Sequence, residues 1–79
     1  MRDTCLHAGE DIRKILYRGA KTLSTEQLDL VMEAVKEAKN KTGGILYRRS
    51  FTGRLKELRD EHKITEMDFH AIIDSLFED

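Results

Sequence analysis

Two short stretches, LSTEQL at residues 23–28 and ITEMDF at residues 64–69, carry the same helix-start signal. In each, a hydroxyl residue (Ser24 or Thr65) stands three positions before a polar residue (Gln27 or Asp68). The side chain of the polar residue can accept a hydrogen bond from the backbone N–H of the hydroxyl residue. Large apolar residues flank both boxes at the positions of a hydrophobic staple. The two stretches therefore predict that helices begin just after Ser24 and just after Thr65.

Apolar residues continue from both starts at the spacing of an amphipathic helix. The first stripe contains Leu28, Val31, Met32, Val35 and Ala38, and the second contains Phe69, Ile72, Ile73, Leu76 and Phe77. Lysines near residue 41 and glycines at 43 and 44 suit a helix end. The predicted helices are residues 25–41 and 66–77. We expect the second stripe to pack in a core, although Leu76 or Phe77 could instead start an interface.

Two further helices are predicted from weaker signals. An apolar stripe from Ile12 to Leu23 predicts a helix over residues 10–22, with the acidic pair Glu10-Asp11 at its N-terminus, where anions are favoured. Asp3 or Thr4 could instead cap an earlier turn.

A second stripe predicts a helix over residues 46–62, with Tyr47, Phe51, Leu55, Leu58 and His62 on one face. If this helix started only at residue 50, residues 45–47 would be extended. A glycine inside it, Gly53, indicates a place where another helix comes close.

These elements predict an all-α fold, a small four-helix bundle built from two helical hairpins, as one domain over residues 1–79. The chain supplies 24 large apolar side chains for the core, apart from Met1. The tetrad Ile-Leu-Tyr-Arg occurs at residues 15–18 and again at 45–48. The two halves otherwise match only at scattered positions, so coincidence is favoured over a duplicated hairpin.

Composition favours a cytoplasmic protein. The single cysteine, Cys5, cannot form an intramolecular disulfide, which suits a reducing compartment. No apolar run approaches the roughly 20 residues that span a bilayer, and the charged N-terminus does not resemble a signal peptide. No membrane partner is therefore expected.

No catalytic, cofactor-binding or metal-binding site is predicted. Cys5, His7, His62 and His70 do not have the spacing of a zinc site. The loop around Gly43-Gly44 lies between two predicted helices, as an EF-hand loop does, but it lacks the carboxylates that calcium requires. The chain also lacks a glycine-rich phosphate loop and the signature of an activated nucleophile. We expect a protein that is not an enzyme, in which Cys5 is a structural thiol.

Charge segregation is the one positive signal for function. Residues 36–59 contain eight basic and two acidic side chains, whereas residues 60–79 contain seven acidic and one basic. On an ideal helix, five basic residues in and just after the third element fall within an arc of about 100°. The candidate partner-binding residues on this arc are Arg48, Arg49, Lys56, Arg59 and Lys63. The alternative is a solvated face whose positive charge is balanced within the protein by the acidic fourth helix.

Residues 54–69 resemble the opening of helix-turn-helix repressor domains, in which a basic first helix leads into a capped second helix. Here RLKELR at residues 54–59 leads into ITEMDF at residues 64–69. No further helix follows that could enter a major groove, so the resemblance supplies no DNA-contacting residue.

Two functions remain as interpretations. The first is a non-enzymatic helical interaction module, a small regulator or adaptor that acts through protein–protein contact with an acidic partner or as a homodimer. The alternative is a nucleic-acid-binding regulator whose basic third helix contacts phosphates.

Overall fold

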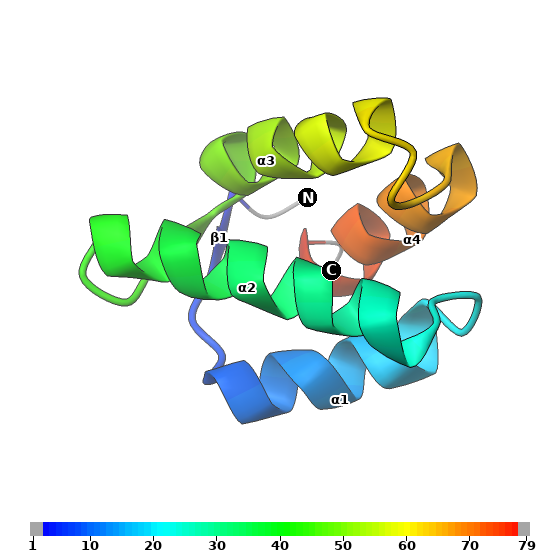
Figure 1. Ribbon diagram of the computed structural model, residues 1–79. Helices are drawn as coiled ribbons and strands as arrows, with labels where there is room; N and C mark the ends of the chain where they lie inside the picture. Colours follow the sequence, from blue (N-terminus) through cyan, green and yellow to red (C-terminus); the bar gives the residue numbers. More distant parts are fainter. Residues whose placement is uncertain (1–2, 78–79) are drawn as a thin grey trace.

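The structure, a computed structural model, describes residues 3–77. Four helices pack around one core, and they are α1 (Gly9–Gly19), α2 (Thr25–Lys41), α3 (Arg48–Asp60) and α4 (Glu66–Phe77). Short strands precede α1 and α3, namely β1 (Thr4–Cys5) and β2 (Leu46–Tyr47). In Figure 1, α2 crosses the molecule between α1 and α3, with α4 behind it. The predicted all-α four-helix bundle of two hairpins is confirmed.

Both predicted capping boxes are present. The Ser24 hydroxyl accepts from the Gln27 backbone N–H at 3.2 Å, and the Gln27 side chain accepts from the Ser24 N–H at 2.9 Å. The Asp68 N–H donates to the Thr65 hydroxyl at 3.1 Å, and the Thr65 N–H donates to the Asp68 carboxylate at 3.2 Å. Helices α2 and α4 consequently have the predicted bounds.

The predicted bounds 10–22 and 46–62 are wrong at both ends. Helix α1 starts at Gly9 and ends at Gly19, because the chain leaves helical geometry at Ala20 after the Ala20 N–H bonds to the Leu16 carbonyl. Helix α3 starts at Arg48 and ends at Asp60.

A left-handed residue ends α3. His62 has a φ of 62°, while its N–H bonds to the Arg59 carbonyl and the Lys63 N–H bonds to the Leu58 carbonyl, the pattern of a Schellman motif. This reversal turns His62 outward, so its prediction on the core face is wrong and its side chain is exposed.

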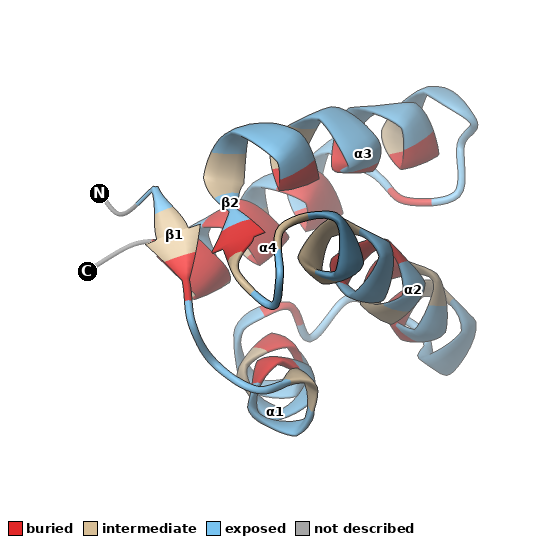
Figure 2. Cartoon of the chain, turned by 90° about the vertical axis from the view of Figure 1, so that its left-hand side faces the viewer, coloured by how far each residue is buried: buried red, intermediate tan, exposed pale blue. Residues whose placement is uncertain are grey.

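The two strands join the N-terminal segment to the start of α3. Thr4 pairs with Tyr47 and Cys5 with Leu46 in an antiparallel register, seen side by side in Figure 2. The Arg48 N–H also donates to the Asp3 carbonyl at 2.7 Å. An early helical turn capped by Asp3 or Thr4 is therefore wrong, whereas the extended alternative for residues 45–47 is correct at 46 and 47.

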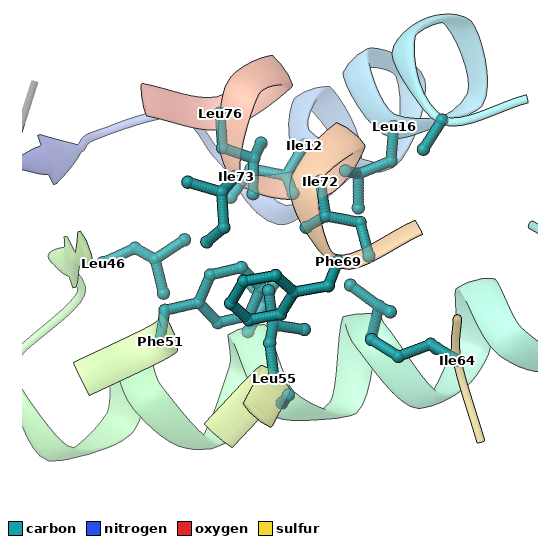
Figure 3. Close-up of a cluster of buried hydrophobic side chains, with 14 of the residues drawn as sticks. Ile12, Leu16, Leu46, Phe51, Leu55, Ile64, Phe69, Ile72, Ile73 and Leu76 are labelled. Atoms are coloured by element: carbon teal, nitrogen blue, oxygen red, sulfur yellow. The ribbon is translucent and has the colours of Figure 1, made fainter. Parts of the chain in front are cut away.

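The core takes side chains from every helix and from β2 (Figure 3). Its largest fully buried apolar members are Phe51, Phe77, Ile12, Leu16, Leu46, Leu55, Ile72, Val31 and Val35. The rings of Phe51 and Phe77 lie 6.3 Å apart, and Leu76 is also buried, so the α4 stripe is core as expected. Tyr47, predicted in the core, is 41% exposed because successive strand residues point to opposite sides and Leu46 points inward.

The repeated tetrad does not mark a repeated hairpin. Residues 15–18 lie inside α1, whereas residues 45–48 run from a loop through β2 into α3. The shared element order is instead strand, helix, helix in each half of the chain.

A close helix approach occurs at Gly19, and the prediction for Gly53 is wrong. A Cβ added at Gly53 would meet nothing within 4 Å, whereas a Cβ at Gly19 would overlap the Ser75 side chain of α4. The Ser75 hydroxyl is held by a 2.7 Å bond to the Ala71 carbonyl. Helix α1 can therefore lie this close to Ser75 without displacing its side chain because residue 19 is a glycine.

We expect opposite effects from the same substitution at these two glycines. Gly53→Ala should raise the free energy of unfolding by about 0.5–1 kcal/mol, because alanine restricts the backbone of the unfolded chain. The added methyl group lies in open space in the folded protein. Gly19→Ala should lower the free energy of unfolding by about 1 kcal/mol, because Ser75 must shift. Chemical denaturation measures both, and equal shifts for the two variants would contradict the packing.

Asp68 is a buried carboxylate, 2% exposed, that joins the two hairpins. Besides the cap at Thr65, it accepts a hydrogen bond from the Thr22 hydroxyl in the α1–α2 loop. Within residues 3–77, no buried side-chain nitrogen or oxygen lacks a hydrogen-bond partner. Both hairpins thus donate hydrogen bonds to the Asp68 carboxylate.

Replacing Asp68 with Ala should lower the free energy of unfolding by about 2 kcal/mol, since the α4 cap and the Thr22 contact are lost together. The matched control is Asp74→Ala, an exposed acid in the last turn of α4, where removal of negative charge is neutral or stabilising. Denaturant titration of both variants gives the comparison. A loss at Asp68 no larger than at Asp74 would show that the buried carboxylate does not join the hairpins.

Candidate protein-interaction groove

A surface groove of about 480 Å³ runs between α3 and α4. We call it the α3–α4 groove. Its α3 wall consists of Arg48, Arg49, Thr52, Gly53 and Lys56, its α4 wall of Phe69, His70, Ile73 and Asp74, and Asp3 adds to it from the N-terminal segment. Basic side chains therefore line one wall, and a mixture of apolar, acidic and imidazole side chains lines the other.

The helical repeat explains why the α3 wall is basic. Residues three, four and seven apart share one helix face, which places Arg49, Thr52 and Lys56 on consecutive turns. The first of the three predicted basic residues on this wall, Arg48, begins the helix. The structure thus brings Arg48, Arg49 and Lys56 together in the groove, as the predicted arc requires.

These three side chains differ in how far they are engaged. Arg48 is half-buried and interacts within the protein. Arg49 and Lys56 are exposed, and neither forms an ion pair with any residue from 3 to 77. Arg49 and Lys56 are therefore the predicted residues that remain available to a partner.

Arg59 is occupied inside the molecule. Its guanidinium lies 3.1 Å from the Glu66 carboxylate and 3.5 Å from that of Asp60, and its central carbon lies 5.1 Å from the centre of the Phe69 ring. These contacts join the last turn of α3 to the first turn of α4. Arg59 acts as a structural link here, as the alternative of a basic face balanced by the acidic fourth helix predicts for this residue.

Lys63 lies outside the groove. Because α3 ends at Asp60, the residue falls in the turn before α4 rather than on the helical arc. Its carbonyl accepts a 3.0 Å bond from the Gln27 side chain, and its own side chain is exposed. The prediction that Lys63 shares one face with the other four basic residues is therefore wrong.

The α4 wall contains residues that the sequence had not singled out as site residues. His70 lies 3.1 Å from Glu66 through its Nε2 atom, and its ring meets that of Phe69 edge-on at 5.3 Å. Asp74 lies one turn further along α4. Helical spacing could have grouped His70 with Asp74, but no local signal places them opposite the basic residues of α3.

Another basic residue of α3, Arg54, is directed toward α2 and away from the groove. Its guanidinium contacts Glu57 at 2.7 Å and Glu37 of α2 at 3.6 Å. The hydrogen bond that Arg54 donates to Glu57, together with the nearby carboxylates, raises the pKa of Arg54 above its ordinary value. Its positive charge is therefore balanced within the protein and adds nothing to the groove.

Two other hollows have less to offer a charged partner. One of about 640 Å³ lies between the start of α1 and α2. Its Asp29 is paired with Arg13 at 2.6 Å and its Lys39 donates to the His7 carbonyl at 2.6 Å, which leaves one exposed cation, Lys36, in a lining that also contains the exposed Glu33. The other, of about 510 Å³, is mainly apolar and is rimmed by Tyr17. The α3–α4 groove combines exposed cations with a defined hollow and is the preferred candidate.

Residues 3–77 contain no group of three histidine, cysteine, aspartate or glutamate side chains placed to hold a metal ion. In the same residues, no helix has the length and apolar character needed to cross a membrane. Comparison of the chain with protein-family models, with curated proteins and with solved structures finds no match.

Arg59 makes contacts within the protein that Arg49 lacks, so the same substitution should lower the free energy of unfolding more at Arg59. Arg59→Gln should lower the free energy of unfolding by about 1 kcal/mol, because it removes the pair with Glu66 and the contact with the Phe69 ring. Arg49→Gln, the matched substitution in the groove, should change it by less than about 0.5 kcal/mol. Urea denaturation distinguishes them, and equal losses would contradict the assignment of Arg59 as a structural link.

Proposed function

We propose that this protein is a non-enzymatic helical interaction module, a small regulator or adaptor that binds another protein through the α3–α4 groove. The observation that carries the proposal is the pair of exposed cations, Arg49 and Lys56, on one wall of a defined groove. Neither forms an ion pair within residues 3–77. Across from them lie the apolar edges of Phe69 and Ile73.

The mixed charge of the groove favours a protein over a nucleic acid. Asp3 and Asp74 lie in the same groove as the cations, and the Glu66 carboxylate is close by on α4. A polyphosphate backbone gains affinity from an uninterrupted positive surface and would be repelled by these acids. A protein segment can match both signs, as complementary protein interfaces do.

The nucleic-acid alternative has one observation in its favour. Arg49, Lys56 and Lys63 are exposed cations without ion-pair partners in the described part of the chain. They do not form one continuous surface, because Lys63 lies outside the groove. Phosphate binding of this kind would weaken steeply with salt, which makes the alternative easy to recognise.

The proposal includes a cytoplasmic location. It is supported by the lone cysteine, Cys5, which is a buried free thiol, as is common in reducing compartments. A homodimer stays a prediction, and sedimentation at increasing concentration tests whether a second copy of the chain is itself a partner.

Filling the groove tests the function without changing any charge. Gly53→Leu adds a bulky side chain where a Cβ meets nothing, and leucine is a better helix former than glycine, so the variant should fold. We expect peptides selected from a display library on the wild-type protein to bind this variant at least about tenfold more weakly, a loss of about 1.4 kcal/mol. Fluorescence polarisation of the selected peptides gives the dissociation constants.

The matched control is Gly9→Leu, which makes the same change at another open glycine, beside the hollow between α1 and α2. This variant should bind the selected peptides as the wild type does. Equal binding by all three proteins would overturn the proposed site. Binding of duplex DNA alone, lost steeply with salt, would replace the proposal by the nucleic-acid alternative.

A further inference from the structure

The two ends of the α3–α4 groove can be told apart. The Arg48 N–H bonds to the Asp3 carbonyl at 2.7 Å, so Asp3 marks the end nearest the strands. Arg59 contacts Glu66 and the Phe69 ring, so the other end lies beside the turn between α3 and α4. We call these the strand end and the turn end of the groove.

Charge is balanced at the strand end. Arg48 and Arg49 occupy the first turn of α3, and the groove residues nearest that end include the carboxylates of Asp3 and Asp74. Asp74 belongs there because it lies one helical turn beyond His70 on α4, away from the turn between the helices. A partner carboxylate at this end would therefore meet acids as well as cations.

Positive charge is unbalanced at the turn end. Lys56 lines this end from α3, with the half-buried Thr52 one turn before it, and His70 lines it from α4. None of the described groove-lining residues at this end is an acid. The nearby Glu66 carboxylate lies against the Arg59 guanidinium and the His70 ring, so its charge is partly satisfied already.

We propose that the turn end of the groove is the binding site for a carboxylate side chain of an acidic protein segment, which would lie beside Lys56 with the Thr52 hydroxyl as a further donor. The His70 ring, whose Nε2 atom is engaged by Glu66, forms the opposite wall. This inference rests on the proposed function and names the chemistry of its partner. The neighbouring apolar edges of Phe69 and Ile73 take an apolar side chain of the same segment.

The exposure of these groups sets the character of the interaction. Lys56 is exposed, so its attraction for a carboxylate is moderate and is screened by salt. Phe69 and Ile73 are each only 6% exposed, so little apolar surface is left for a partner to cover. The complex is therefore transient, and charge contributes most to its specificity.

Fluorescein-labelled peptides of equal length, built from Leu with Glu, Leu with Gln or Leu with Lys, test the charge preference. The wild-type protein should bind the Glu peptide most tightly and the Lys peptide least. In Lys56→Glu the dissociation constant of the Glu peptide should rise by at least about fivefold, and that of the Lys peptide should fall. Circular dichroism verifies that the variant is folded, as expected for an exposed residue.

Lys14→Glu is the matched control, because it makes the same change in net charge on an exposed face of α1 outside the groove. This variant should change the affinity for the Glu peptide by less than twofold (about 0.4 kcal/mol). An equal effect of Lys14→Glu and Lys56→Glu, or tighter wild-type binding of the Lys peptide, would overturn the carboxylate site. A larger effect of Lys56→Glu on duplex DNA than on the Glu peptide would also overturn it.

Gly53→Leu separates this inference from the proposed function. If all three peptides bind the wild type equally and Gly53→Leu abolishes their binding, the groove is a docking site but the carboxylate preference is wrong. If Gly53→Leu leaves the binding of every peptide unchanged, the groove is not the docking site and the proposed function itself fails.

Discussion

The hydrogen bonds of the Asp68 carboxylate tie the two hairpins of the bundle together. A charged group that is 2% exposed is stable only when its oxygens are satisfied. One bond comes from the Thr65 backbone at the start of α4, and the other from Thr22 in the loop of the first hairpin. The same group therefore starts the last helix and holds the α1–α2 loop against it, which helps to fix how the two hairpins pack.

Contacts at the opposite side of the bundle complete this arrangement. The antiparallel pair of β1 and β2 joins the N-terminal segment to the start of α3, and Cys5 enters the core from β1. Gly19 lets α1 approach α4 at Ser75, since any side chain there would overlap it. With only 79 residues, the chain has a small core, and such specific contacts between hairpins weigh heavily in its stability.

Packing also decides which charges stay available. The basic third helix and the acidic fourth helix are neighbours, so some of their charges neutralise each other, as Arg59 and Glu66 do at 3.1 Å. Arg54 is likewise paired with Glu37 and Glu57. Arg49 and Lys56 face the groove and form no ion pair within residues 3–77. A nearly neutral chain thus keeps in one groove two cations without ion pairs to the described residues.

Features that depend on residues close together in the chain could be predicted from the amino-acid sequence alone. The capping boxes at Ser24 and Thr65, the bounds of α2 and α4, and the apolar stripes follow from helical spacing and local hydrogen bonds. The basic face of α3 was also predictable for Arg48, Arg49 and Lys56, because one helix fixes their relative directions.

Features that depend on segments far apart in the sequence became visible in the folded chain. The strand pair needs a partner far away in sequence, and so does the alternation of an inward Leu46 with an outward Tyr47. The α4 wall of the groove also depends on distant segments, since His70 and Asp74 become site residues only when α4 packs beside α3. Local propensity carries no information about such pairings, because their energy comes from contacts that form only in the folded chain.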